Sequence, residues 1–128
     1  MQLNHLDLPV PKTSETKAFF VEHLGFKCVF DRDDGLTVLI DEAGFALTLS
    51  PLPTDESLMY STGFHVGFNF QEESQLIRAH DRLVAAGLEV VRPLGQFGGA
   101  LTFQCNAPGP ILVEFGWRPR ASQETPIN

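Results

Sequence analysis

Short segments of this chain alternate hydrophobic and polar residues with the period of two that half-buried β-strands require. Two longer segments instead carry apolar residues at helical spacing, and a glycine follows each of them, Gly25 and Gly87. Glycine is the usual residue just past a helix C-terminus. The pattern predicts helices from Thr13 or Ser14 to about Leu24 and from Glu72 to Ala86. The predicted strands cover residues 3–9, 26–31, 37–41, 45–50, 64–70, 88–92, 101–105 and 111–115.

The order of these elements repeats along the chain. A strand, a helix and three strands occupy residues 3–50, and the same order returns in residues 63–117 after a proline-rich linker at 51–62. We therefore predict a single α+β domain of two tandem βαβββ modules, followed by a C-terminal tail at 118–128. A helix would cover one face of each sheet. The other faces would then be free to form a cup-shaped, partly open β-barrel.

The alternation also predicts which polar side chains lie on the faces away from the helices. His5 and Asp7 share that face of the first strand, His65 has it in the fifth strand, and Glu114 in the eighth. Two imidazoles and a carboxylate with open coordination positions are suited to bind a divalent metal ion. In the fourth strand, Thr48 takes the repeat position of Glu114 and is a poor ligand. The predicted metal site therefore has three protein ligands.

Each of these residues also has an ordinary structural interpretation. A histidine that lines a cavity can simply bond to a polar neighbour, and Glu114 can pair with Arg118 or Arg120. Asp7 is a candidate general base or a residue that orients a ligand, or else an acid at the rim of the cup. The matching positions in the repeat favour the metal site. We expect Gly95–Gly99 to form a flexible loop over the cup.

Length and charge restrict the range of functions. The chain has 128 residues and a formal net charge of −7, so it lacks the basic surface that nucleic acid or an anionic membrane would need. It shows no signal peptide at its start and no segment that could cross a bilayer. Cys28 and Cys105 are far apart, which favours buried thiols in a reducing compartment. We predict a cytoplasmic protein.

The repeat, together with the opening Asn4-His5-Leu6-Asp7-Leu8, resembles the vicinal oxygen chelate superfamily. That group includes glyoxalase I, bleomycin-resistance proteins, fosfomycin-resistance enzymes and extradiol dioxygenases. The resemblance covers residues 3 to about 117. It implies that His5, His65 and Glu114 are the metal ligands, since metal-dependent members take theirs from the first strand of each module and the last strand of one or both. It also implies a homodimer whose site is shared between subunits.

The function implied is that of a small metal-dependent enzyme. One divalent ion (Fe, Mn, Zn or Ni) would bind a small-molecule substrate through neighbouring oxygens, with Asp7 as the proton carrier. The reaction would be that of a lyase, a transferase or a dioxygenase. Thr48 argues against glyoxalase I, which has four protein ligands, and the uncharged Gly95–Gly99 segment argues against a phosphonate substrate. The alternative is a metal-free protein that sequesters a small molecule, like the bleomycin-resistance members.

Overall fold

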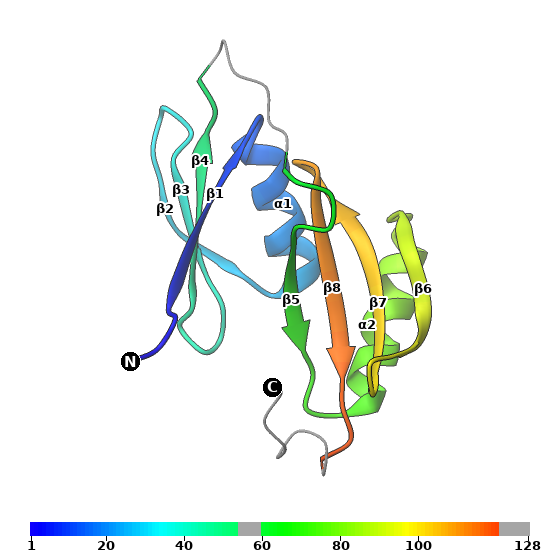
Figure 1. Cartoon of the computed structure of the whole chain (residues 1–128). Coiled ribbons are helices and arrows are strands. Elements are labelled where there is room, and N and C mark those ends of the chain that lie inside the picture. The colour runs from blue at the N-terminus through cyan, green and yellow to red at the C-terminus, as the bar shows by residue number, and fades with distance from the viewer. Residues whose placement is uncertain (54–59, 121–128) are drawn as a thin grey trace. The chain divides into compact units, whose positions relative to one another are not determined.

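The computed structural model describes residues 1–53 and 60–120. It contains the two predicted βαβββ modules, which confirms the α+β class and the tandem repeat (Figure 1). The chain divides into two compact units, Met1–Ser61 with Pro108–Pro110, and the remainder. The elements are β1 (His5–Val10), α1 (Thr13–Leu24), β2 (Lys27–Asp31), β3 (Thr37–Ile40), β4 (Ala46–Pro51), β5 (His65–Asn69), α2 (Glu73–Ala85), β6 (Val90–Phe97), β7 (Ala100–Ala107) and β8 (Ile111–Trp117).

The first module is a four-stranded sheet in the order β1-β4-β3-β2 with α1 packed against it. The first strand pairs in parallel with β4, and the other pairs are antiparallel. Apolar side chains alternate with polar ones along β1 and β4, so one face of the sheet meets the helix and is removed from water. The fully buried residues of this core include Leu8, Val10, Phe20, Leu39 and Leu49.

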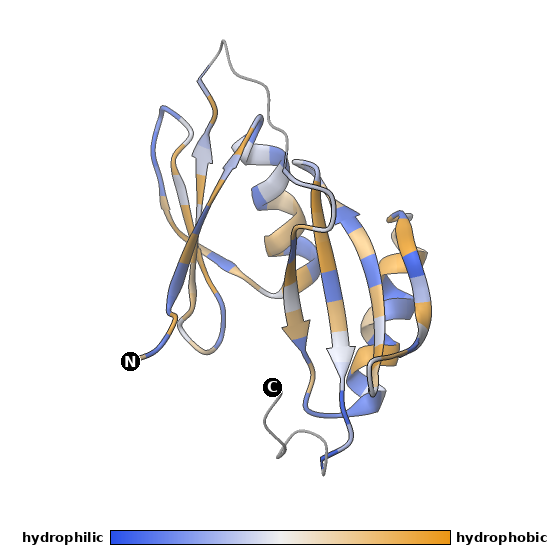
Figure 2. Ribbon diagram, in the orientation of Figure 1, coloured by the Kyte–Doolittle hydropathy of each residue, from blue (hydrophilic) through white to orange (hydrophobic). Residues whose placement is uncertain are grey.

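The second module repeats that topology in the order β5-β8-β7-β6, with α2 packed against it. Leu76, Ala79 and Leu83 form the buried side of α2. The rings of Phe103 and Phe115 stack in this core, with centroids 4.8 Å apart and planes at 16°. Hydropathy alternates from residue to residue along β7 and β8, so each of these strands has an apolar face and a polar face (Figure 2).

The strand register confirms how the two halves correspond. In the first module His5 pairs with Ala46 and Asp7 with Thr48. In the second module His65 pairs with Leu112 and Gly67 with Glu114. Thr48 therefore occupies the position of Glu114 in the repeat, as the sequence predicts.

The expected flexible loop at Gly95–Gly99 is wrong. Residues 95–97 continue β6, where Phe97 pairs with Ala100 across a two-residue turn. Gly98 and Gly99 both have positive φ, at 59° and 79°, which is the conformation that a tight hairpin turn of this length demands. Two register shifts in β6, on either side of Arg92, interrupt the alternation from which strands are recognised.

Both cysteines are free thiols. Cys105 is buried in β7, and burial raises the pKa of its thiol to about 11. That thiol is therefore neutral and packs as a small apolar side chain. In the described part of the chain, neither α1 nor α2 has the length and apolar character that crossing a bilayer requires.

Candidate functional site

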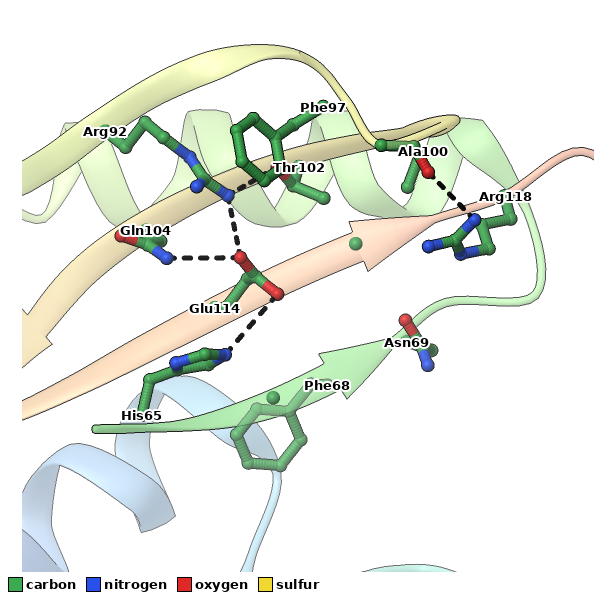
Figure 3. Close-up of a pocket in the computed structure, with 13 residues that line it drawn as sticks. His65, Phe68, Asn69, Arg92, Phe97, Ala100, Thr102, Gln104, Glu114 and Arg118 are labelled. Atoms are coloured by element: carbon green, nitrogen blue, oxygen red, sulfur yellow. Dashed lines mark hydrogen bonds and ion pairs between the residues drawn. The ribbon is translucent and has the colours of Figure 1, made fainter. Parts of the chain in front are cut away.

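The polar face of the second sheet carries a pocket of about 500 Å³. Among the residues that the structure describes, its lining comes from all four strands of that sheet, from Gly98 in the turn between β6 and β7, and from Arg118 just after β8 (Figure 3). Phe68 and Phe97 contribute apolar surface. The polar side chains around it include His65, Asn69, Arg92, Gln104, Glu114 and Arg118.

Glu114 contacts three other side chains of the pocket. Its Oε1 accepts hydrogen bonds from Arg92 Nη2 at 2.7 Å and from Gln104 Nε2 at 3.1 Å. Both contacts follow from the register, because Arg92 pairs with Gln104 and Gln104 with Glu114 across three adjacent strands. The alternative reading of Glu114 as a carboxylate paired with an arginine therefore holds with Arg92 in place of Arg118 or Arg120. The other oxygen, Oε2, lies 3.7 Å from His65 Nε2 (Figure 3).

The imidazole of His65 has its orientation fixed by the backbone. Its Nδ1 lies 2.8 Å from the carbonyl oxygen of Gly63. A carbonyl oxygen can only accept, so in the neutral ring Nδ1 carries the hydrogen and Nε2 keeps its lone pair. This is the arrangement in which a histidine is held ready as a metal ligand. The side chain is 40% exposed, so Nε2 is accessible from the pocket.

The first module carries His5 and Asp7 on the exposed side of β1. His5 Nδ1 lies 2.7 Å from Asn4 Oδ1, so this ring too keeps a lone pair on Nε2. Asp7 accepts a hydrogen bond from the hydroxyl of Ser50. Burial, and secondarily the negative charge of Asp7, raises the pKa of Tyr60, whose hydroxyl donates to the carbonyl oxygen of Pro9.

The structure thus brings two of the predicted ligands, His65 and Glu114, together in the second module. It places His5 and Asp7 together on one face of the first module. Within the described residues of either module taken alone, no three His, Cys, Asp or Glu side chains are arranged to hold a metal ion.

Two arginines of the pocket, Arg92 and Arg118, are not among the site residues that the sequence predicts. Arg92 Nη2 also donates to Thr102 Oγ1 at 2.8 Å, and its guanidinium lies 4.4 Å from the centre of the Phe97 ring. Arg118 Nη1 donates to the carbonyl oxygen of Gly98 at 3.1 Å. Alternation along β8 could have indicated Arg118, since Glu114 and Arg118 are an even number of residues apart. Alternation along β6 does not predict the face on which Arg92 lies, because the strand register shifts on both sides of it.

Glycines leave space between these groups. Gly67 and Gly116 lie on neighbouring strands and line the pocket. A Cβ on Gly116 would come within 3.3 Å of Thr102 Cγ2 and 3.4 Å of Asn69 Oδ1. A Cβ on Gly67 would meet only the backbone oxygen of Glu114, at 3.9 Å. Gly67 is therefore the exposed position without a side chain, whereas Gly116 is buried and its neighbours already fill the space that a side chain there would need.

Comparison with known proteins gives a consistent picture. The chain is similar to the structure of a possible glyoxalase from Bacillus cereus, with 31% identity, a TM-score of 0.78, and coverage of 90% of this chain and 97% of the other. It also shares the fold of the fosfomycin resistance protein FosX from Listeria monocytogenes, with 18% identity, a TM-score of 0.79 and 98% of each chain covered. A lactoylglutathione lyase from Agrobacterium tumefaciens shows the same fold at 14% identity, with a TM-score of 0.71 and coverage of 91% of this chain and 92% of the other. No curated protein matches the sequence.

The profile of one protein family matches residues 2–115, which is nearly the whole chain. It is the family to which the sequence resemblance points. The chain belongs to the Glyoxalase/Bleomycin resistance protein/Dioxygenase superfamily.

Proposed function

We propose that this protein is a small divalent-metal-dependent enzyme that acts on a substrate with neighbouring oxygen atoms. The observation that supports it most is the pairing of His65 and Glu114, each of which has a prepared ligand atom. Nε2 of His65 has a lone pair, and Oε2 of Glu114 accepts no hydrogen bond from the part of the chain that the structure describes. Gln104 and Arg92 hold the remaining oxygen and fix the orientation of the carboxylate.

The donor set fits a divalent ion of the kind that family members use. Two neutral imidazoles and one carboxylate suit Fe(II), Mn(II), Zn(II) or Ni(II). His65 and Glu114 would be ligands together with His5, whose Nε2 also keeps its lone pair. When bound, such an ion acts as a Lewis acid toward substrate oxygens. Asp7, exposed and hydrogen-bonded to Ser50, is the proton carrier in this proposal.

His5 belongs to one module and its proposed co-ligands to the other. We propose a homodimer in which His5 of one subunit completes the site formed by His65 and Glu114 of the second subunit. A variant with His5→Ala and one with Glu114→Ala would then each lose the metal, whereas dimers that combine the two variants would regain one site. Stoichiometric metal in a stable monomer would contradict the shared site.

A second candidate function is metal-free binding of a small molecule. Arg92 favours it, because its guanidinium, 2.7 Å from Oε1, already balances the charge of Glu114. A cation so close to a metal ligand lowers the affinity for a divalent ion. In this case the pocket would sequester its ligand without chemistry.

Metal content distinguishes the two functions. We expect protein prepared with Fe(II), Mn(II), Zn(II) or Ni(II) to hold about one equivalent per site by elemental analysis, and Glu114→Gln to lose it. Thr48→Val is the matched control, because Thr48 has the corresponding position in the first module and is no ligand. Metal-free wild-type protein under all four conditions would overturn the enzyme and support the binding protein.

A further inference from the structure

We propose that Phe97 determines the specificity of the pocket in the second module by stacking against an aromatic ring of the ligand. The ligand ring would lie on the face of Phe97 that Arg92 does not cover. The proposal deepens the proposed function by naming a substrate class for the same pocket, compounds that carry an aromatic ring near their neighbouring oxygen atoms. It rests on that function only for the role of the oxygen atoms.

Phe97 presents an apolar ring to the pocket. Phe68 and Phe97 are the two phenylalanines among the described residues that line it, and they differ in their surroundings. The Phe68 ring stacks on Phe115 of the core, with centroids 5.7 Å apart. Phe97 lies outside the core and is 63% exposed. Contact between its ring and a ligand would therefore remove apolar surface from water without any change in the core.

The fold itself does not require a phenyl ring at this position. Phe97 is the last residue of β6 and pairs with Ala100 across the hairpin turn. The methyl group of Ala100 is too small to cover a phenyl ring, so the cross-strand pair contributes little packing. Single exposed apolar side chains are common on protein surfaces, and exposure alone does not identify a binding residue. Phe97 in addition lines a pocket and contacts a charged partner, Arg92.

Arg92 holds the ring in a defined orientation. Its guanidinium carbon lies 4.4 Å from the centre of the Phe97 ring, a cation–π contact (Figure 3). The guanidinium is itself fixed by hydrogen bonds from Nη2 to Glu114 Oε1 at 2.7 Å and to Thr102 Oγ1 at 2.8 Å. Arg92 thus occupies one face of the ring and leaves the other for a ligand. The positive charge behind the ring reduces the negative potential of its π system, which lessens the repulsion between two stacked rings.

The Phe97 ring lies close to the proposed metal ligands. The same guanidinium contacts the ring and Glu114 Oε1, and the Oε2 of that carboxylate is 3.7 Å from His65 Nε2. A ligand ring on Phe97 therefore needs only a short spacer to bring oxygen atoms to His65 and Glu114. The volume of the pocket, about 500 Å³, is ample for such a molecule. This arrangement favours an aromatic compound whose oxygen atoms lie on a short side chain of the ring.

The test compares aromatic probes with saturated probes of the same ring size. The pairs are 1-phenyl-1,2-ethanediol with 1-cyclohexyl-1,2-ethanediol, and benzyl alcohol with cyclohexylmethanol. Every probe is uncharged, so net charge does not distinguish the members of a pair. A cyclohexyl ring buries at least as much apolar surface as a phenyl ring, so burial alone gives the aromatic probe no advantage. We expect the aromatic member of each pair to bind chelator-treated protein roughly three- to tenfold more tightly in NMR titrations, because only this member can stack on Phe97.

Three variants assign the preference to Phe97. Phe97→Leu should remove it, whereas Phe97→Tyr, which keeps an aromatic ring, should retain it. Phe30→Leu is the matched control and should also retain it, because Phe30 is 48% exposed on β2 of the first module and lies outside the pocket lining. No aromatic preference in the wild-type protein, its persistence in Phe97→Leu, or equal loss in Phe30→Leu would overturn the proposal.

A second readout needs no substitution. In complexes of the wild-type protein with the aromatic probes, nuclear Overhauser effects should connect the ring protons of the probe with those of Phe97, because stacked rings lie in contact. A bound aromatic probe without such effects to Phe97 would place its ring elsewhere and overturn the proposal.

The outcome does not depend on metal binding. The probes are tested on metal-free protein, so the aromatic preference and its loss in Phe97→Leu can be observed even if the protein holds no metal ion. Conversely, a full equivalent of metal without any aromatic preference would leave the proposed enzyme standing and refute the substrate class.

Discussion

The two modules have the same strand order, but the side chains on the sheet face away from the helix differ between them. In the first module Phe30, Val38 and Thr48 lie side by side on β2, β3 and β4. The corresponding residues of the second module are Arg92, Gln104 and Glu114, which form a hydrogen-bonded row. The next positions differ as well. The first module has Asp7 and Ser50 bonded to each other where the second has glycines.

This difference shows that, in a duplicated fold, one module can carry charged residues at positions where the other carries none. The buried faces of both sheets remain apolar, so each module keeps its core. The substitutions are confined to the opposite face, where a side chain can change without altering the packing against the helix. Charged groups and glycines in the second module produce a pocket. In the first module, Phe30, Val38 and the uncharged Thr48 occupy the positions of the charged row, and Asp7 and Ser50, bonded to each other, occupy those of the glycines.

The largest expected effect concerns the two cores. Phe115 and Leu49 hold corresponding buried positions, and only Phe115 belongs to an aromatic stack. Phe115→Ala should lower the free energy of unfolding by about 3–5 kcal/mol because it leaves a large cavity, and Leu49→Ala by about 2–5 kcal/mol. Phe115→Leu, which copies the first module, should cost about 1–2 kcal/mol, mainly the aromatic contact. Urea denaturation measures all three. If Phe115→Leu lowered the free energy of unfolding as much as Phe115→Ala, the core of the second module could not accept the residue that the first module has at this position.

A smaller effect is expected where the second module departs from the first by a charge. Arg92→Gln removes the cation beside Glu114, so Zn²⁺ should bind roughly three- to tenfold more tightly at low salt. The fold should lose less than about 1 kcal/mol, since Arg92 and Glu114 are both partly exposed. Titration calorimetry provides the affinity, and Arg78→Gln on α2 controls for net charge. Weaker binding in Arg92→Gln would mean that the guanidinium acts chiefly by orienting the carboxylate.

The sequence pattern predicts the fold and two residues of the pocket, His65 and Glu114, but not Arg92. Alternation and the repeat locate the strands and place His65 and Glu114 on one face, because a strand fixes side-chain direction with a period of two. Arg92 lies beyond this reasoning, since shifts in β6 break the period on both sides of it. The sequence predicts a flexible loop at Gly98 and Gly99, where the structure has a tight hairpin turn, because glycine is typical of both. The contact between Arg92 on β6 and Glu114 on β8 depends on how β6, β7 and β8 align with one another. Amino-acid composition does not specify that alignment.

The central claim is that His65 presents an unprotonated Nε2 beside Glu114 as part of a metal site. NMR of the four histidine rings in ¹⁵N-labelled protein tests it most directly, because the ring nitrogens report both tautomer and coordination. In metal-free protein we predict hydrogen on Nδ1 of His65. On addition of one equivalent of Zn²⁺, Nε2 of His65 and of His5 should shift, while His23 on α1 and His80 on α2 serve as internal controls and stay unchanged. Hydrogen on Nε2 of His65, or Zn²⁺ shifts confined to the helix histidines, would contradict the claim.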